Sequence, residues 1–313
     1  MLLIGILGSL ASAAEVGFAY IGGTFTTISV PLATATFPEG INDAGQIVGY
    51  YNTANGEAHG FVDTGGVFTT IDAPLGVGQT YASGINNAGQ VAGFYTNGSG
   101  YFGFLKTGGV FTTLIDPAAV TFSGGTYAQG INDVGQIVGY HTGIGFDDVS
   151  GTEGFLYASG AYTTIAYTSA SVTVAQGINN GGQIVGDYYN VFSPSPTQGF
   201  SYIGGVFTTI NYPGASDTEI NGLNNMGQIV GQYVASNSRA GNGFLDTGGT
   251  FTTLNYPQAF DTRLNGINDS GEIVGYADTE IPEPSTLLMI FPALLGTAGR
   301  FVCKRVRAHA ARH

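Results

Sequence analysis

Positive charge is scarce in this sequence of 313 residues, which has eight Lys and Arg against 21 Asp and Glu. Five of the eight basic residues lie in the last 14 positions, whereas all the acidic residues lie between Glu15 and Glu283. Within that span three basic residues stand against 21 acidic ones, a net charge of −18. A body this acidic repels a phosphate backbone, so we expect no nucleic-acid partner.

Cysteine is nearly absent as well, since Cys303 is the only one in the sequence. A single thiol cannot form an internal disulfide, so the fold must depend on its apolar core. Only 9% of the residues are charged and 12% are aromatic, a composition too apolar for a disordered chain. We expect a globular protein that buries roughly three quarters of the surface of its unfolded chain.

Several motifs of catalytic chemistry are missing. The sequence contains no G-x-S-x-G elbow, no P-loop, no H-E-x-x-H helix and no Cys/His cluster with metal-ligand spacing. Of the four histidines, His59 and His141 are predicted to stand alone on loops, without an identifiable partner. We therefore expect no catalytic residues, no enzyme activity and no organic cofactor.

Residues 1–14 are predicted to be a secretory signal peptide. A short apolar run precedes Ala11-Ser12-Ala13, which has the small-x-small pattern of a cleavage site. No Lys or Arg precedes the apolar run, and an incorrectly assigned start codon would explain the missing basic start. The alternative is a buried first strand. The signal-peptide interpretation makes the Sec translocon a partner.

Residues 279–313 have the parts of a linker and a sorting tail. An uncharged, mostly apolar run at 286–299 predicts a hydrophobic helix, which is short of the ~20 residues that span a bilayer unless it continues to Cys303. Basic residues after the run orient the terminus toward the cytoplasm. The residues that we assign to a sorting signal are Pro282, Glu283, Pro284, Arg300, Lys304, Arg305 and Arg307.

This tail resembles the PEP-CTERM sorting signal of Gram-negative bacteria that make exopolysaccharide. The resemblance rests on IPEPST directly before the apolar run and on the basic residues after it. It implies an exosortase-type membrane enzyme as a partner, which recognises the tail and processes the protein near the PEP motif. The implied location is an inner-membrane intermediate held by the C-terminal helix, and then the cell surface or the extracellular space. The alternative is an ordinary C-terminal anchor.

Between the two ends the chain repeats two short motifs six times each, at spacings of 44 to 47 residues for the first. This regular period marks a repeat architecture. The first motif has the form GINDAGQIVG and begins at Gly40, Gly84, Gly130, Gly177, Gly222 and Gly266. The second has the form GFVDTGGVFTTI and begins at Gly17, Gly60, Gly103, Gly154, Gly199 and Gly243.

Both motifs are typical of β-hairpins. Asn-x-x-Gly matches the preferences of a type I turn, and Gly-Gly those of a two-residue hairpin turn. No segment of the repeat region has a helical period. Each repeat therefore contains four short antiparallel strands, which is what one β-propeller blade requires. We predict an all-β fold, a six-bladed β-propeller over residues 15–278, followed by the C-terminal hydrophobic helix.

The two ends of the repeat region predict a closed ring. The first hairpin, from Gly17 to Ile28, supplies the third and fourth strands of a blade, and residues 262–276 supply its first and second strands. We expect Gly17 to Ile28 to pair with Glu272 to Tyr276, since this pairing leaves no half-blade unpaired. A right-handed β-helix is the main alternative, but it has no use for twelve hairpin turns.

The repeats also resemble the HAF-type extracellular repeats of bacterial surface proteins. The match is clearest in AHGFVDTGGVFTTIDAP at residues 58–74, and the other copies lack the histidine before Gly-Phe. The resemblance implies a location at the cell surface and does not imply an activity.

One position varies where its neighbours do not. Four residues before the first glycine of each GINDAGQIVG motif is always threonine, and the next residue is Phe37, Tyr81, Tyr127, Val174, Glu219 or Arg263. In a four-stranded meander the tight turns share one face and the longer loops share the other, which places this position at the loop-side mouth of the channel. Aromatic rings beside polar groups are typical of sugar-binding sites, and binding residues are often found on loops.

We therefore predict a polysaccharide site at this mouth, formed by Phe37, Tyr81, Tyr127, Glu219 and Arg263, with help from Asp147 and Asp148. The alternative is that the rings only fill the mouth. Asp147, Asp148 and Glu153, in the longest loop of its class, could also hold Ca²⁺, with a solvated loop as the alternative. The Asn-Asp-x-Gly segments lack the oxygen spacing of a calcium loop and are predicted to be turns.

Three functions remain open from the sequence. The first is an exported, non-catalytic surface or matrix protein associated with exopolysaccharide and biofilm. The second is a propeller enzyme, a glycan lyase or hydrolase, which would need a pair of carboxyl groups facing the channel. The third is a purely structural matrix component.

Overall fold

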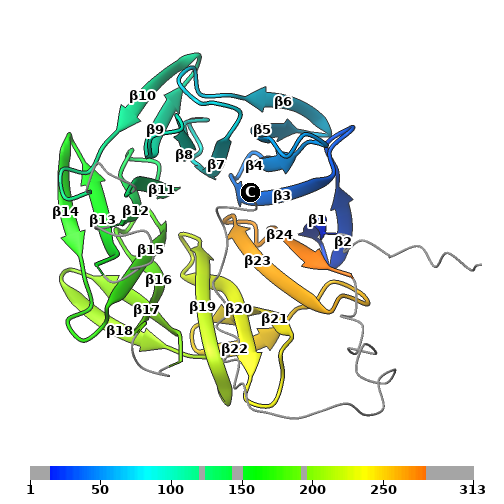
Figure 1. The fold of residues 1–313 in the computed structure, drawn as a ribbon. Helices are drawn as coiled ribbons and strands as arrows, with labels where there is room; N and C mark the ends of the chain where they lie inside the picture. Colours follow the sequence, from blue (N-terminus) through cyan, green and yellow to red (C-terminus); the bar gives the residue numbers. More distant parts are fainter. Residues whose placement is uncertain (1–14, 120–123, 143–150, 192–195, 280–313) are drawn as a thin grey trace, which may run out of the picture. The chain divides into compact units, whose positions relative to one another are not determined.

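The computed structural model describes residues 15–119, 124–142, 151–191 and 196–279. This part of the chain forms 24 strands in six four-stranded antiparallel sheets, arranged as blades around a central channel (Figure 1). The predicted six-bladed β-propeller is confirmed. The predicted signal peptide at 1–14 and the C-terminal helix lie outside the described residues. Within the described ranges there is no helix of the length and hydropathy needed to cross a membrane.

The strands follow one another blade by blade. Blade 1 contains β3 (Ala35–Ile41), β4 (Gln46–Asn52), β5 (Ala58–Thr64) and β6 (Val67–Ile71). Blade 2 contains β7 (Thr80–Ile85), β8 (Val91–Thr96), β9 (Tyr101–Thr107) and β10 (Val110–Leu114). Blade 3 contains β11 (Thr126–Ile131), β12 (Ile137–His141), β13 (Glu153–Ala158) and β14 (Ala161–Ile165).

The remaining blades follow the same order. Blade 4 contains β15 (Val172–Ile178), β16 (Ile184–Tyr189), β17 (Gln198–Ile203) and β18 (Val206–Ile210). Blade 5 contains β19 (Ala215–Leu223), β20 (Gln228–Ala235), β21 (Gly241–Thr247) and β22 (Thr250–Thr253). Blade 6 contains β23 (Asp261–Ile267), β24 (Ile273–Asp278), β1 (Glu15–Ile21) and β2 (Thr24–Ile28).

Blade 6 closes the ring with strands from both ends of the chain. Its order is β2-β1-β24-β23, and β1 runs antiparallel to β24 with Gly17 opposite Tyr276 (Figure 1). This is the predicted pairing, and its reason is that β1 and β24 would each otherwise be an exposed sheet edge. The β-helix alternative is wrong, because every strand pair within the six sheets is antiparallel.

The Asn-x-x-Gly segments are tight turns, as predicted, and they also connect the blades. In the first turn, Gly45 has a φ of 72°, a backbone conformation that favours glycine, and the Asn42 Oδ1 accepts hydrogen bonds from the backbone N–H groups of Ala44 and Gln46. The Asn42 Nδ2 donates to the Asn86 carbonyl of the next blade at 3.1 Å. The equivalent bond recurs at all six blade junctions, at 2.9–3.4 Å.

A second ring of hydrogen bonds runs beside the first. The backbone N–H of Asp43 donates to the Asn87 Oδ1, and the same bond joins every following pair of turns at 2.7–2.9 Å. Each repeat therefore carries the groups that fasten it to the next one. This explains why the chain repeats a segment with so little chemical reactivity.

The core lies between the blades. The phenylalanine of every Gly-Phe motif is completely buried, at Phe18, Phe61, Phe104, Phe155, Phe200 and Phe244. Phe61 of blade 1, for example, shares a cluster with Val274 of blade 6. Full burial of such a side chain contributes about 1.5–3 kcal/mol. A side chain at Gly139 of β12 would overlap the carbonyl oxygen of Tyr127, which explains the glycine at this point of the second strand.

The threonine that precedes the variable position is structural, as predicted. Its hydroxyl oxygen accepts a hydrogen bond from a backbone N–H at the end of the preceding blade, at 2.9–3.1 Å in all six blades. All six threonines are buried, at Thr36, Thr80, Thr126, Thr173, Thr218 and Thr262.

Candidate functional site

The variable positions lie near the loop-side end of the channel, each beside a partner on the second strand of its own blade. Three blades pair aromatic with aromatic and three do not. The pairs are Phe37 with Tyr50, Tyr81 with Phe94, Tyr127 with Tyr140, Val174 with Asp187, Glu219 with Gln232, and Arg263 with Tyr276.

Seven of these side chains form a continuous aromatic arc across blades 6, 1, 2 and 3. Within a blade the rings stack, as in Tyr81 on Phe94 with centroids 4.7 Å apart. Between blades they meet edge to face, as in Tyr50 with Tyr81 at 4.9 Å. The aromatic arc consists of Tyr276, Phe37, Tyr50, Tyr81, Phe94, Tyr127 and Tyr140.

The tyrosines of the arc are neutral hydrogen-bonding groups. Burial raises the pKa of Tyr81 and of Tyr276 to about 12, because a phenolate loses hydration there. The Tyr81 hydroxyl donates to the Gln79 Oε1 at 2.8 Å. Tyr81 and Tyr127 are half-buried, whereas Phe37 is only 4% exposed. Tyr81 and Tyr127 are thus the variable positions of the arc whose rings are partly exposed, whereas the Phe37 ring packs against Tyr50 and Tyr276.

A polar seam lies in blades 5 and 6, and we use this name for Glu219, Gln232, Asp261 and Arg263. The pair of Val174 and Asp187 in blade 4 belongs to neither the arc nor the seam. The Arg263 Nη2 is 3.2 Å from the Glu219 Oε2, and its guanidinium carbon lies 5.9 Å from the centre of the Tyr276 ring. The Gln232 Nε2 donates to the Asp261 Oδ1 at 2.7 Å. The seam therefore joins the aromatic arc through the cation–π contact of Arg263.

Below the arc, a β-bulge in each first strand adds a residue that has no partner on the second strand. In blade 2, for example, Ala82 and Gly84 face consecutive residues of β8, and Ser83 lies between them. A bulge redirects one side chain, and here all six extra residues line the channel. This bulge ring consists of Glu39, Ser83, Gln129, Gln176, Asn221 and Asn265.

The channel itself is too small for a sugar. The bulge ring borders a hollow of about 80 Å³ on the loop side, and the Asn and Asp turns border one of about 70 Å³ on the other side. Both hollows are also lined by a ring of apolar side chains: Ile41, Ile85, Ile131, Ile178, Leu223 and Ile267. A cavity of roughly 150 Å³ holds benzene. Sugars must therefore bind on the surface of the mouth, if they bind here.

Other predicted site residues fall elsewhere. Asp147 and Asp148 lie outside the described residues, as do the sorting-signal residues from Pro282 to Arg307. Glu153 was expected in a loop, but it is the first residue of β13 and pairs with His141. Its carboxylate is 3.8 Å from the His141 Nε2. Within the described residues, no three acidic, cysteine or histidine side chains are grouped as metal ligands.

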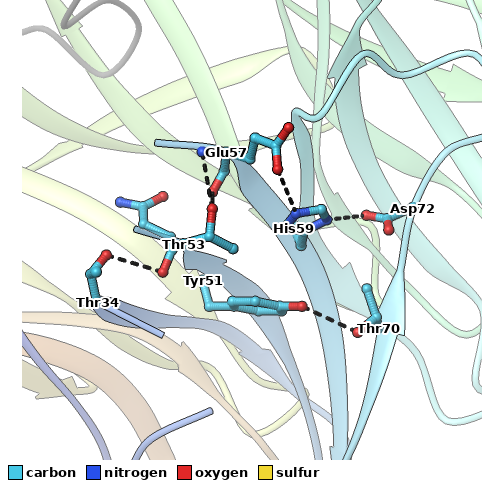
Figure 2. A network of polar contacts seen from close by, with 8 residues as sticks. Thr34, Tyr51, Thr53, Glu57, His59, Thr70 and Asp72 are labelled. Carbon is cyan, nitrogen blue, oxygen red and sulfur yellow. Dashed lines mark hydrogen bonds and ion pairs between the residues drawn. The ribbon is translucent and has the colours of Figure 1, made fainter. Parts of the chain in front are cut away.

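The prediction that His59 and His141 stand alone on loops is wrong. His59 lies on β5, and Figure 2 shows it between Glu57 and Asp72, with its Nδ1 2.9 Å from the Asp72 Oδ1. The Tyr51 ring packs on the His59 ring at 5.5 Å. His141 ends β12, and its Nδ1 lies 3.0 Å from the Asp116 Oδ2 in a buried pair. Both carboxylates come from the connection to the neighbouring blade, which the hairpin pattern does not reveal.

Sequence reasoning also missed the partners of the variable positions and the bulge ring. The second-strand partners could have been found from the sequence, because an aromatic residue follows most GQIVG runs. The tight turn between the first and second strands fixes the register that places this aromatic residue opposite the variable position. The sequence signal for Glu39 was weaker: it is the only charged residue at the position before the repeat glycine. No local pattern announces the bulge that directs it into the channel.

No protein-family model matches the chain, and no curated protein matches it. Among solved structures, a TolB protein of Agrobacterium tumefaciens is similar, with a TM-score of 0.62 and 12% identity over 86% of this chain and 100% of that one. TolB of Acinetobacter baumannii has a TM-score of 0.52 and 11% identity over 85% of this chain and 64% of that one. A lectin of Aleuria aurantia bound to Fucα1-6GlcNAc reaches 0.46 at 13% identity, over 79% and 97%. The similarity to the two TolB structures shows the fold alone.

Proposed function

We propose that this protein is an exported, non-catalytic surface or matrix protein that binds polysaccharide of the producing cell at the loop-side mouth of its propeller. The observation that carries the proposal is the division of that mouth into an aromatic arc and a polar seam. Sugars present both apolar C–H faces and hydroxyl groups. Aromatic rings contact the first, and carboxylates, amides and guanidinium groups bind the second.

The dimensions of the site favour a polymer over a small sugar. The loop-side hollow of about 80 Å³ admits no monosaccharide, so contact is limited to exposed edges around the mouth. Single contacts of this kind are weak, on the order of 1 kcal/mol each. A chain of sugars that touches several copies of the protein gains affinity through multivalency, which a matrix of anchored protein provides.

Export and sorting belong to the same proposal. The cleavage pattern near Ala13, the PEP motif at 282–284 and the basic residues that follow the apolar run support passage through the Sec translocon and processing by an exosortase-type enzyme.

The charge of the protein disfavours a phosphate polymer as the ligand. Both hollows of the channel are lined by neutral side chains apart from a few acids, and the net charge of residues 15–283 is −18.

The decisive experiment is a binding assay with purified exported protein on immobilised exopolysaccharide from the producing organism and on a panel of unrelated glycans. We expect saturable binding to the organism's own polymer and weak binding to the panel. Release of oligosaccharides from the polymer would favour the glycan-active enzyme instead. Absence of binding to every glycan tested would contradict the proposed binding site. It would favour the third function, a purely structural matrix component.

A further inference from the structure

The bulge ring contains one carboxyl group without a protein partner. Glu39 is the only charged residue of the ring, and no described residue forms a hydrogen bond with its side chain. The positive charge of Arg263 lowers the pKa of Glu39, but the Arg263 guanidinium is already paired with Glu219 at 3.2 Å. Burial raises the pKa of Glu39 to about 8, because its charged form is poorly compensated there. The group therefore lacks the neutralising contact that buried carboxylates normally have.

Asn265, which precedes Glu39 in the bulge ring, and Asn221, which precedes Asn265, have oxygens available to the channel. The Asn265 Nδ2 donates to the Pro38 carbonyl at 2.9 Å, and the Asn221 Nδ2 donates to the Leu264 carbonyl at 2.9 Å. Because each amide nitrogen is committed to the backbone of the next blade, each Oδ1 is the group left for the hollow that these residues line. No described residue donates a hydrogen bond to either oxygen.

We propose that the loop-side hollow binds a hard cation of the Ca²⁺ type, held by the Glu39 carboxylate together with the amide oxygens of Asn221 and Asn265. Hard cations prefer carboxylate, amide and water oxygens, and a hollow of about 80 Å³ has room for an ion with its remaining waters. A site with one carboxylate binds weakly, in the range of extracellular calcium modules, roughly 10⁻⁴–10⁻³ M. This inference is independent of polysaccharide binding.

The other end of the channel provides the matched control. Asp43, Asp133 and Asp269 line the hollow on the turn side, and each carboxylate accepts hydrogen bonds from neighbouring turns. These acids are a competing place for a cation. A variant in each ring therefore distinguishes the two ends of the channel.

Terbium luminescence tests the proposal directly. Tb³⁺ occupies calcium sites and emits when a nearby aromatic ring transfers energy to it, and this chain has 18 Tyr and no Trp. Tyr50 and Tyr276 lie near Glu39, since each influences or is influenced by its charge. We expect saturable emission from the purified protein that millimolar Ca²⁺ displaces, and at least a tenfold loss of Tb³⁺ affinity in Glu39→Gln. Asp269→Asn should leave the affinity unchanged.

A variant with an added carboxylate separates loss of the site from loss of folding, because misfolding cannot raise Tb³⁺ affinity. Ser83 belongs to the same ring, so Ser83→Asp should raise Tb³⁺ affinity about tenfold, and it should restore binding to Glu39→Gln. Unaltered affinity in Glu39→Gln, a loss in Asp269→Asn alone, or emission that Ca²⁺ does not displace would each overturn the assignment. The thermal unfolding curve of each variant is measured alongside.

Discussion

The Asn268 side chain of blade 6 donates a hydrogen bond to the Asn42 carbonyl of blade 1 at 3.1 Å, although 226 residues separate them in the chain. This bond closes the same ring of contacts that joins every other pair of neighbouring blades. The Asn268 Oδ1 also accepts from the backbone N–H groups of Ser270 and Glu272. One amide therefore stabilises both its own turn and the junction between the chain ends.

We expect Asn268→Ala to destabilise the protein by about 2–3 kcal/mol, since it leaves buried backbone groups unpaired. Urea unfolding followed by circular dichroism measures the change. Asn97→Ala is the matched control, because Asn97 is exposed and bonds only within its own loop, and it should cost well below 1 kcal/mol. Equal effects of the two substitutions would contradict the role of the ring.

Deletion of residues 1–28 removes the third and fourth strands of blade 6. It exposes β24 as an open edge and uncovers Val274 and its neighbours in the core. We expect the cooperative unfolding transition to disappear. A truncated protein with the melting temperature of the full chain would show that the pairing of β1 with β24 is dispensable.

Replacement of Tyr81 and Tyr127 by alanine should weaken binding to the producing cell's polysaccharide at least tenfold, about 1.4 kcal/mol. The reason is the loss of two of the partly exposed rings of the aromatic arc. Tyr202→Ala, which removes a ring that packs on Phe207 between the third and fourth strands of blade 4, serves as control. Unchanged binding in the double variant, or a collapse of its melting curve, would mean that the arc only fills the mouth.

Stability should fall as the pH rises from about 4.5 to about 8. The folded protein holds the Glu39 proton up to about pH 8, whereas the ordinary pKa is 4.5. The contribution of Glu39 to the free energy of unfolding is therefore complete below about pH 4.5 and is lost as the pH approaches 8. Tyr50 and Tyr276 stay neutral in this window, and Arg263 stays charged. Urea unfolding in EDTA at pH 5, 6.5 and 8 should show a smaller decline for Glu39→Gln; parallel declines would contradict the assignment.

The tail makes a prediction about the mature protein. If an exosortase-type enzyme processes the chain near the PEP motif, protein recovered from the cell surface should lack Thr286 to His313. Mass spectrometry of surface material decides this. Recovery of the intact C-terminus would indicate a permanent anchor.

The architecture was predictable because local signals and chain order agree. Asn42 and Gly45 specify one turn, the Gly-Gly pairs specify another, and the incomplete repeats at the two ends require closure. The contents of the channel were not predictable, because Glu39 reaches it through a bulge between β3 and β4 that no local sequence pattern announces. The pairs of His59 with Asp72 and of His141 with Asp116 were missed for a similar reason. Their carboxylates come from connections between blades, where the repeat pattern is weakest.

The closure of blade 6 also determines how the propeller bears mechanical load. Asp278, at the end of β24, lies opposite both Glu15 of β1 and Asp261 of β23. A pull along β24 from residue 279 would therefore shear two hydrogen-bonded ladders at once, whereas the outer strand of an ordinary blade would peel away one bond at a time. A chain held by its C-terminal tail would transmit force into the strongest strand position of its final blade.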